Sequence, residues 1–516
     1  MATGKTTVGK LLAERLKREF IDTDELIQAR QGQSIPEIFE EQGETCFRQM
    51  EADIAEELGG RKDLVISTGG HLMLDPVNVA ALSRNGRVFC LLATPQEILS
   101  RIESDNEHQR PLLEVPNPGE QIVELLKERM KGYHRFQKII TNGKKPFEVT
   151  EDLIAIFQDV PTRFSIDHPT QPSEYVVGTA ILPLVRELTG INGTIVVISD
   201  TEVHELYGQS CGDVDHVITI PVGNQNKTLA TVQDIYTQLV DIGFDRSGTI
   251  MSLGGSMVCD VAGFVAATYM RGVNFIQCPT SLSAIADTSI GGNFSIDIPG
   301  RKNLIGVFKQ PSLVIADIAA LQTLPQENFT SGMAEIIKYG FIADSSLLEK
   351  VEKGNWHYEL GTLFTSHFEI QSLINHAIQV KTAALTDVDP YDSGQPNILH
   401  FGHTFAHAIE QVSENSLRHG EAVAMGMVAA ANLSFLLGHC SAHVQERIEG
   451  ILEKVGLPTR IPRNLDVEQM LKAMDNDNKS LGGVARFVVL SRIGESFITA
   501  NVSNSIVEAA LKEISR

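Results

Sequence analysis

Short apolar runs alternate with helical patterns in two successive stretches of the chain, and this alternation limits the possible folds more than any other feature. In the first stretch, LVIST (64–68) and RVFCLLAT (87–94) are strand candidates, and helical spacing marks 8–18 and 150–158. The second stretch holds the strand candidates 174–178, 193–199, 216–222, 249–255 and 273–279. Continuously apolar strands of this length are typical of parallel sheets that are covered on both faces. The sequence therefore predicts two α/β units.

The last third of the chain has a different pattern. After about residue 324 the strand signals fade, and helical patterns continue to the end apart from ARFVVLS (485–491). A chain of 516 residues is also too long for one core. We therefore expect three domains, which are an α/β domain at 1–158, a second α/β domain at 162–324 and a mostly helical domain at 325–516.

The composition excludes several classes of partner. A net charge of −22 and a pI near 5.1 argue against nucleic acid or an anionic membrane, because these would need a basic face. The six cysteines are scattered without a C-x-x-C pair, which is typical of reduced cytosolic thiols. The N-terminus has no signal-peptide core, and polar residues interrupt the apolar run from Ala422 to Leu437, so we expect a buried helix there. These features predict a cytoplasmic protein that acts on small molecules.

The stretch Gly4-Lys5-Thr6-Thr7 stands directly before a predicted helix and matches the end of a phosphate-binding loop, G-x-x-x-x-G-K-[ST]. Backbone N–H groups and the helix end would bind ATP, with Lys5 at the β- and γ-phosphates and Thr6 on Mg²⁺. A chance G-K-T before a helix is the alternative. The motif's first glycine and its strand would precede Met1. We therefore expect Met1 to be an internal residue of the loop and the gene to encode an apolar strand upstream.

A second group of reactive side chains lies in HFGHTFAHAIE and LRHGEAVAMG. His403 and His407 are four residues apart and share a helix face, and His419 follows sixteen residues after His403. Glu335 lies in another predicted helix. Two histidines and one glutamate would leave an open position for substrate on Zn²⁺ or a similar ion such as Co²⁺. The alternative is a set of hydrogen-bonded polar residues at helix ends.

Five further motifs accompany the phosphate loop: FIDTDELI, FRQME, ISTGGHL, RPLL and ERMKGYHRF. In this order and spacing the set resembles shikimate kinase over nearly all of 1–158, which implies a P-loop kinase-type parallel sheet. The resemblance assigns the substrate to Asp24, Arg48, Gly70 and Arg129, and the ATP phosphates to a lid that carries Arg110. Asp24 would activate the acceptor hydroxyl, and the two arginines would hold the shikimate carboxylate.

The second half contains another set of motifs: GGSMVCDVAGFVAATYMRG, PTSLSAIADTSIGG, GRKNLIGVF and LQTLP. With the histidine stretches, this set resembles 3-dehydroquinate synthase from about residue 162 to the C-terminus. The resemblance implies an α/β NAD-binding domain, a helical metal-binding domain and a homodimer formed through them. The implied reaction converts a seven-carbon sugar phosphate (DAHP) to 3-dehydroquinate. A ring alcohol is oxidised with NAD, phosphate leaves, and the carbonyl is reduced again.

The same resemblance implies roles for individual residues. The metal ligands would be Glu335, His403 and His419. The catalytic groups would be Lys338, His407 and Asp287. The cofactor would lie against Gly223, Lys227, Gly255, Ser256, Asp260, Thr280, Ser281, Lys302 and Thr323. The anionic groups of the substrate would contact Lys338, Arg271, Asn303 and Lys479.

The chain departs from both families near the expected chemistry. His71 replaces a third glycine at the shikimate floor. Ser256 and Cys259 place side chains where backbone usually approaches the pyrophosphate, and Asn224 replaces a carboxylate expected near the ribose. The remaining changed contacts are Asn293, Thr382 (for which Lys381 could substitute), Pro396, His400 and Asn478. Losing three charge-assisted hydrogen bonds of ~1.5–3 kcal/mol each would cost on the order of 10³-fold in the cyclase reaction.

Four interpretations remain open on the sequence. A bifunctional enzyme of aromatic biosynthesis is favoured, because both activities belong to one pathway. The changed anion contacts also allow a kinase joined to an inactive cyclase that serves dimerisation or stability. They equally allow a cyclase for another sugar phosphate. A non-catalytic nucleotide sensor is the least favoured of the four.

Overall fold

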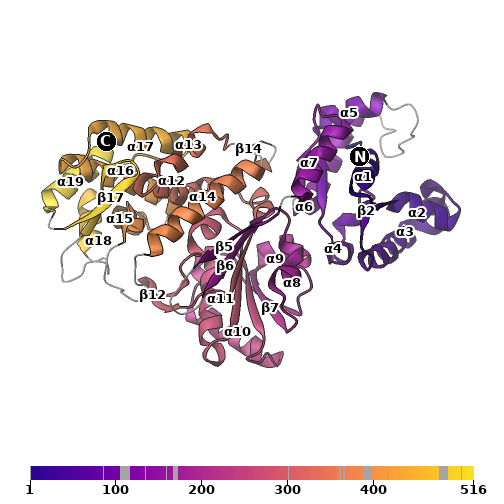
Figure 1. Cartoon of the computed structure of the whole chain (residues 1–516), viewed down its shortest axis with the longest axis horizontal. Helices are drawn as coiled ribbons and strands as arrows, with labels where there is room; N and C mark the ends of the chain where they lie inside the picture. The colour runs from indigo at the N-terminus through magenta and orange to yellow at the C-terminus, as the bar shows by residue number, and fades with distance from the viewer. Residues whose placement is uncertain are drawn as a thin grey trace.

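The computed structural model describes residues 2–84, 86–104, 117–133, 135–158, 160–166, 172–299, 301–356, 358–359, 362–363, 367–386, 397–414, 416–475, 486–500 and 502–515. Figure 1 shows three bodies in chain order: an α/β body in indigo and purple, an α/β body in magenta, and a mostly helical body in orange and yellow. We call them the first α/β domain, the second α/β domain and the helical domain. The order of folds predicted from the sequence is confirmed.

The first α/β domain begins with helix α1 (Lys5–Leu16), directly after the glycine of the Gly-Lys-Thr stretch. Its other helices are α2 (Thr23–Gln31), α3 (Ile35–Gly59), α4 (Pro76–Ser83), α5 (Pro95–Ser104), α6 (Pro118–Tyr133) and α7 (Pro146–Gln158). Its strands are β1 (Glu19–Asp22), β2 (Leu64–Ser67), β3 (Phe89–Leu92) and β4 (Gln137–Ile140). The two helices predicted at 8–18 and 150–158 are present as α1 and α7.

The sheet of this domain is split. Among the described residues, β1 pairs only with β2, and β3 pairs only with β4, each pair in parallel. The sequence predicts buried strands at 64–68 and 87–94, but β2 is half-buried over three of its four residues and β3 over all four. That expectation is wrong, because a two-stranded piece leaves one edge of each strand without a neighbouring strand to cover it.

The second α/β domain is built on a seven-stranded sheet in the order β5-β6-β13-β10-β9-β7-β8. Only the β5–β6 pair is antiparallel. The strands are β5 (Thr162–Ile166), β6 (Ser173–Gly178), β7 (Ile195–Asp200), β8 (His216–Ile220), β9 (Thr249–Gly254), β10 (Asn274–Pro279) and β13 (Leu313–Asp317). The main helices are α8 (Val185–Thr189), α9 (Thr201–Tyr207), α10 (Leu229–Asp241) and α11 (Ser256–Thr268). Separate apolar clusters fill the two faces of the sheet, as expected for continuously apolar strands.

An antiparallel hairpin follows β10 and packs on α11. It consists of β11 (Asn293–Ile298) and β12 (Arg301–Phe308). Phe294 is wholly buried in it, and a Cβ at Gly263 of α11 would lie 2.4 Å from the Phe294 ring. Glycine at this point therefore lets the hairpin approach the helix, which brings the hairpin to the carboxyl end of the sheet.

The helical domain surrounds α16, which is almost entirely buried and confirms the buried helix predicted at 422–437. Its helices are α12 (Gln326–Ile342), α13 (Ser345–Lys353), α14 (His367–Thr386), α15 (His403–Val412), α16 (His419–Leu436), α17 (Ala442–Val455), α18 (Val467–Asp475) and α19 (Asn504–Ile514). Its short strands are β14 (Tyr358–Glu359), β15 (Thr362–Leu363), β16 (Arg486–Arg492) and β17 (Glu495–Ala500). The sequence predicted β16 but missed its partner β17, whose residues are mostly exposed.

The two α/β domains also touch away from their joint. The guanidinium of Arg87 donates to the carbonyls of Ile156 and Phe157 at the end of α7, and to the carbonyl of Thr179 in the second domain. The N–H of Lys138 in β4 donates to Gln322 Oε1 at 2.9 Å. The first domain is thus docked on the loop that carries one predicted cofactor residue, Thr323.

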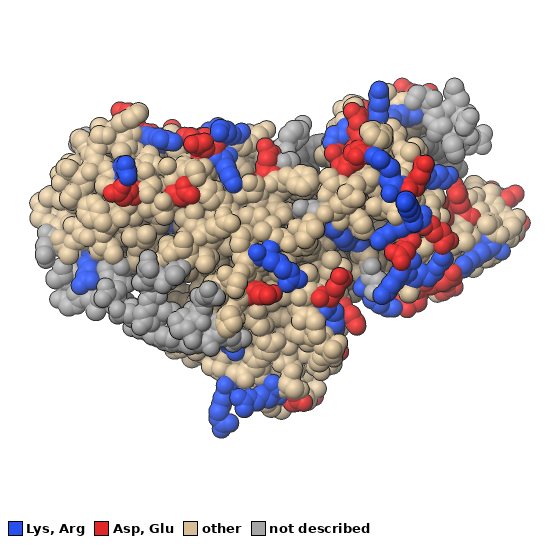
Figure 2. Space-filling view, in the orientation of Figure 1, with Lys and Arg blue, Asp and Glu red and all other residues tan. Residues whose placement is uncertain are grey.

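The visible face carries charges of both signs. Figure 2 shows Lys and Arg intermingled with Asp and Glu over the first domain at the right, and fewer charges over the helical domain at the left. The first domain also contains exposed ion pairs, among them Arg30–Glu57 at 2.8 Å and Arg61–Glu19 at 2.7 Å. Within the described residues, no helix has both the length and the apolar character needed to cross a bilayer.

Candidate active sites

The Gly-Lys-Thr stretch forms the start of α1 in the first domain. Gly4 is the N-cap and has a φ of 88°, a left-handed conformation that favours glycine. Thr6 Oγ1 donates to Asp22 Oδ2 at 2.9 Å, so the hydroxyl predicted to bind Mg²⁺ lies beside a carboxylate that could share the ion. Burial lowers the pKa of Lys5, although Asp24 and Asp22 oppose this. The sequence reasoning did not assign a role to Asp22, which is the last residue of β1 and contacts Thr6 of the phosphate-binding stretch.

Asp24 is not a helix cap. Asp22 caps α2 by accepting from the N–H groups of Asp24 and Glu25, which excludes a purely structural role for Asp24 as the cap of this helix. Burial raises the pKa of Asp24, and the nearby Asp22 raises it further. A Cβ at Gly69 would lie 2.5 Å from Asp24 Oδ1, so ISTGG backbone packs directly on this carboxylate. A carboxylate with a raised pKa beside a backbone turn is suited to accept a proton from a bound hydroxyl.

The predicted carboxylate clamp is assembled around the same turn. Arg48 Nη1 donates to Glu51 Oε2 at 2.7 Å, and Arg48 Nη2 donates to Glu44 Oε1 at 2.9 Å. A Cβ at Gly70 would lie 2.8 Å from Arg129 Nη1, so glycine lets the guanidinium approach the backbone this closely. Sequence reasoning missed Glu51, which is 2% exposed and orients Arg48. Its spacing of three residues from Arg48 on one helix was the available signal.

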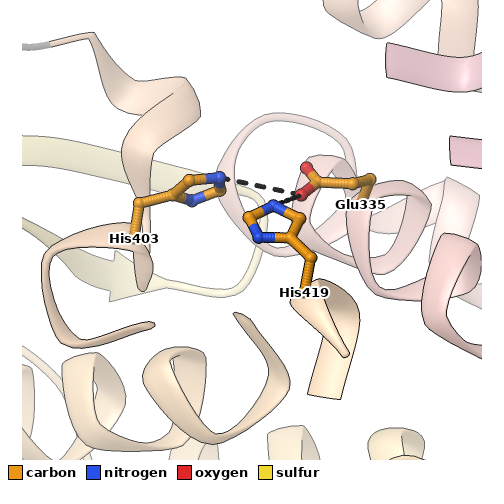
Figure 3. A group of neighbouring side chains, drawn as sticks. All are labelled: Glu335, His403 and His419. Atoms are coloured by element: carbon orange, nitrogen blue, oxygen red, sulfur yellow. Dashed lines mark ion pairs between the residues drawn. The ribbon is translucent and has the colours of Figure 1, made fainter. Parts of the chain in front are cut away.

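The predicted metal ligands converge in the helical domain (Figure 3). Glu335 comes from α12, His403 from the start of α15 and His419 from the start of α16. Glu335 Oε1 lies 3.6 Å from His403 Nε2 and 3.4 Å from His419 Nε2. Ligand atoms about 2.0–2.1 Å from a tetrahedral ion lie roughly 3.4 Å apart, so the spacing fits Zn²⁺ or an ion of similar size.

Two further observations test the fit of a metal. Within the described part of the chain, buried Glu335 Oε1 has no hydrogen-bond partner, which a cation between the three groups would satisfy. The other nitrogen of each imidazole has a partner of its own. His419 Nδ1 lies 3.1 Å from Glu410 Oε1, and His403 Nδ1 lies 3.3 Å from the carbonyl of Phe401. Such partners fix the ring and leave Nε2 for the metal.

Each carboxylate around this centre lies beside a positively charged or basic side chain. Lys338 Nζ donates to Glu335 Oε2, and both side chains are almost wholly buried. Burial alone would raise the pKa of Glu335, but the Lys338 ammonium holds it well below its usual range. Burial would lower the pKa of His419, but the neighbouring carboxylates of Glu335 and Glu410 raise it to about 10. Lys338 is therefore ion-paired with Glu335, and its contact with a substrate anion stays a prediction.

Two more imidazoles surround His403. The centroid of the His403 ring lies 5.8 Å from the centroid of the His407 ring and 5.9 Å from that of the His400 ring. The rings of His403 and His419 are separated by a similar distance, 5.7 Å. His407 and Glu410 follow His403 at spacings of four and seven on α15, so all three share one helix face. The sequence reasoning named His407 but missed Glu410, although the spacing could have indicated it.

Asp287 forms a third charged group near the metal centre. Lys381 Nζ donates to Asp287 Oδ1 at 2.6 Å, and Tyr339 Oη donates to the same oxygen at 2.5 Å. Burial would raise the pKa of Asp287, but Lys381 holds it below its usual value. Lys381 is therefore paired with a predicted cleft residue, and its substitution for the lysine missing at Thr382 stays a prediction.

The predicted cofactor residues lie along the carboxyl edge of the seven-stranded sheet. Gly254 ends β9, Gly255 caps α11, and the N–H of Thr280 donates to the carbonyl of Gly254 at 2.9 Å. Lys227 Nζ pairs with Asp260 Oδ2 at 2.5 Å and donates to Asn303 Oδ1 at 2.6 Å. The remaining predicted cofactor residues lie on loops or on the hairpin beside them, and they are Gly223, Ser281, Lys302 and Thr323. Gly223 has a φ of 106°, and Thr323 Oγ1 lies 2.6 Å from Tyr207 Oη. The ammonium of Lys302 helps to lower the pKa of Glu410.

The structure changes the expectation for Cys259 at this edge and adds Asp200. Cys259 is wholly buried and points under the loop, with Sγ 3.7 Å from the carbonyl of Gly254, so it cannot obstruct a pyrophosphate. Asp200 ends β7, which neighbours β9, and burial raises its pKa. Asp200 Oδ1 caps α9 (Thr201–Tyr207) by accepting from the N–H of Val203 at 2.8 Å, and Asp200 lies at the carboxyl end of the sheet, where ligands of such sheets bind. The sequence reasoning did not assign Asp200 a role, although it belongs to the end of an apolar strand.

Not all predicted residues join these clusters. Arg271 follows the C-terminal end of α11, about 20 Å along the helix from the cofactor edge, so it cannot contact a substrate in this subunit's cleft. The contact of Arg271 with a substrate stays a prediction. The His71 side chain is largely exposed. Its partial burial and the nearby cations Arg48 and Arg129 lower its pKa. Arg110, Pro396, Asn478 and Lys479 lie outside the described residues.

The first domain therefore has the geometry of a P-loop phosphotransferase, and the remaining domains have that of a metal-dependent enzyme with a dinucleotide-binding sheet. Residues 1–158 match the family model of shikimate kinase. Residues 217–331 match the 3-dehydroquinate synthase N-terminal model, and 332–480 match the C-terminal model. The chain belongs to the 3-dehydroquinate synthase family and carries a shikimate kinase domain in front of it.

Individual relatives agree with these matches. The 3-dehydroquinate synthase of Rippkaea orientalis is 38% identical over 325 residues, which are 61% of this chain and 88% of that protein. A crystal structure of 2-deoxy-scyllo-inosose synthase with carbaglucose-6-phosphate, NAD⁺ and Co²⁺ has a TM-score of 0.59 at 24% identity, over 68% of this chain and 99% of that one. ValA from Streptomyces hygroscopicus, with NAD⁺ and Zn²⁺, has a TM-score of 0.61 at 22% identity over the same shares. These two structures support the fold alone.

Proposed function

We propose that the chain is a bifunctional enzyme of the shikimate pathway, with kinase residues at 1–158 and synthase residues at 162–324 and 325–516. The kinase would phosphorylate shikimate to shikimate 3-phosphate from ATP and Mg²⁺. The synthase would convert the seven-carbon sugar phosphate to 3-dehydroquinate with NAD and Zn²⁺ or Co²⁺. The observation that carries the proposal is Glu335 Oε1, a buried oxygen that faces two imidazole nitrogens at 3.4 Å and 3.6 Å in a chain of the synthase family.

In the kinase half, Lys5 and the backbone at the start of α1 would hold the β- and γ-phosphates. Asp24 would accept the proton of the attacking hydroxyl, which its raised pKa favours. Arg48, held by Glu51 and Glu44, and Arg129 would fix the carboxylate of shikimate. Arg110 remains a prediction for the lid.

In the synthase half, the bound metal would polarise a hydroxyl and then a carbonyl, while NAD accepts and returns a hydride. Glu335, His403 and His419 would hold that metal. His407, one turn after His403, would face the substrate, and Asp287 would be kept ionised by Lys381. Lys227, Asp260 and Asp200 would orient the dinucleotide at the edge of the sheet.

Two assays on the full chain test the proposal. The first measures ADP formation from ATP with shikimate, and the second measures phosphate release from the seven-carbon sugar phosphate with NAD and divalent metal. Asp24→Asn should abolish the first and leave the second unchanged, whereas His403→Ala should do the reverse and lower the bound zinc or cobalt. Failure of either wild-type activity, or retention of metal by His403→Ala, would contradict the corresponding half.

One observation favours a second candidate function, a cyclase for another sugar phosphate. Lys381 is committed to Asp287, Lys338 to Glu335 and Lys227 to Asp260, so these three cations already have carboxylate partners. A substrate with fewer anionic groups would then compete less with these pairs. Comparing kcat/KM for sugar phosphates with and without a carboxylate decides between the two functions.

We also propose a homodimer through the synthase part. Arg271 lies at the far end of α11 beside Met270, which is 45% exposed, so only another subunit could present Arg271 to the cleft. Mixing inactive Arg271→Ala and His403→Ala proteins should restore part of the synthase activity, because a mixed dimer has one intact cleft. Absence of recovery after subunit exchange would contradict the dimer.

A further inference from the structure

Hydroxyl groups from three segments meet at the start of α11. Ser256 is the first residue of the helix, Ser281 follows β10, and Thr288 lies a further turn along the chain. Thr288 Oγ1 donates to Ser256 Oγ at 3.0 Å. All three residues are half-buried, so a ligand at the edge of the sheet can reach them.

The hydrogen bond from Thr288 decides the orientation of Ser256. A hydroxyl has one proton to donate and can accept two bonds. Since Ser256 Oγ accepts from Thr288, its own proton remains available to an acceptor on the open side of the loop. The backbone N–H groups of the first turn of α11 point to the same side, because the first N–H groups of a helix have no partner within the helix.

There is space for an anionic ligand beside these donors. Among the described residues, and apart from its chain neighbours Gly254 and Ser256, the only residue within 4 Å of a Cβ placed on Gly255 is Ser281, whose Oγ lies at 3.6 Å. Gly255 therefore has an open face, bordered by two serine hydroxyls and the uncapped start of a helix. This arrangement of donors is complementary to a phosphate oxygen.

We propose that Ser256 is a phosphate-binding residue whose hydroxyl donates to the pyrophosphate of the dinucleotide and is oriented for this by Thr288. The inference rests on the proposed function, because it takes the ligand of this edge to be NAD. The sequence analysis expects the cofactor to lie against Ser256 and notes that its side chain stands where backbone usually approaches the pyrophosphate; the proposal makes that side chain a donor rather than an obstruction. Obstruction and donation predict opposite effects of removing the side chain.

The experiment measures the Kd for NADH by its nicotinamide fluorescence on the full chain, so no turnover is needed. Ser256→Gly, which restores the usual family residue, and Ser256→Ala should each weaken binding roughly tenfold, the effect of losing one hydrogen bond to a charged group. Thr288→Val should weaken binding about threefold. The double variant Ser256→Ala, Thr288→Val should bind no more weakly than Ser256→Ala, because Thr288 acts through Ser256. The Tm and the bound metal of the same proteins monitor the folding of the synthase part.

The outcomes separate this inference from the proposed function. If Ser256→Gly binds NADH as tightly as the wild type or more tightly, Ser256 is no donor and the inference is wrong while the NAD site stands. If the effects of Ser256→Ala and Thr288→Val simply add, Thr288 does not act through Ser256 and the orienting role is wrong. If the wild type shows no saturable NADH binding, both the inference and the NAD-dependent function fail.

Discussion

Gly69→Ala should inactivate the kinase without unfolding it. The added Cβ would lie 2.5 Å from Asp24 Oδ1 and 3.2 Å from Glu51 Oε1, whereas ordinary contact begins at 3.4 Å. The Asp24 carboxylate must therefore move by about 0.9 Å. The move costs little stability, because the contacted atoms end side chains and Gly69 does not have a positive φ. A displacement of about 1 Å at a reacting group costs on the order of 10²-fold in kcat, or about 2.7 kcal/mol.

The assay is ATP-dependent phosphorylation of shikimate, with phosphate release by the synthase as the internal reference on the same chain. Gly60→Ala is the matched control, because Gly60 has a φ of −80° and its Cβ would lie 3.6 Å from the Glu57 carbonyl oxygen, an ordinary contact distance. We expect normal activity and Tm for the control, and normal Tm with roughly 10²-fold lower kcat for Gly69→Ala. A kcat within about twofold of wild type would refute the placement of Asp24 at the reacting hydroxyl, given that steric displacement.

Three further predictions follow from the geometry. 1,10-Phenanthroline in excess Mg²⁺ should abolish phosphate release and spare shikimate phosphorylation; loss of both would contradict two separate metal requirements. Lys381→Met should lower the free energy of unfolding near pH 7 by roughly 1–3 kcal/mol, because Asp287 loses its ammonium partner while a third of its side chain stays solvated. Since Lys381 depresses the pKa of Asp287, the pair stabilises above the unfolded value of about 3.9 and is lost on acidification, so the Tm difference should shrink as the pH falls; a constant difference would disprove the pairing. Arg87→Ala should speed trypsin cleavage between the α/β domains, because the Thr179 carbonyl loses its donor, and an unchanged cleavage rate would show that Arg87 does not hold the interface.

Local patterns predicted much of the fold. Apolar spacing indicated α1, α7 and the buried α16, and the continuously apolar runs indicated the strands of the seven-stranded sheet. These predictions hold because the spacing of apolar residues within one helix or strand depends only on the local sequence. The edge strand β17 was missed because its residues are mostly exposed and carry no such period. The split of the first sheet was not visible in β2 and β3 themselves, since their burial depends on a neighbour.

The motifs indicated the family and the types of side chain at each site. Residues at a fixed spacing in the sequence lie at the same helix end or on the same helix face, so their spacing alone predicts that they meet. Only the tertiary structure decided which partner each of those side chains contacts. It set Asp22 rather than Asp24 as a cap, buried Cys259 beneath the loop, and joined Lys381 to Asp287 across 94 residues of sequence. An ion pair or a steric contact depends on distances of a few ångströms between distant segments, and sequence spacing does not contain those distances.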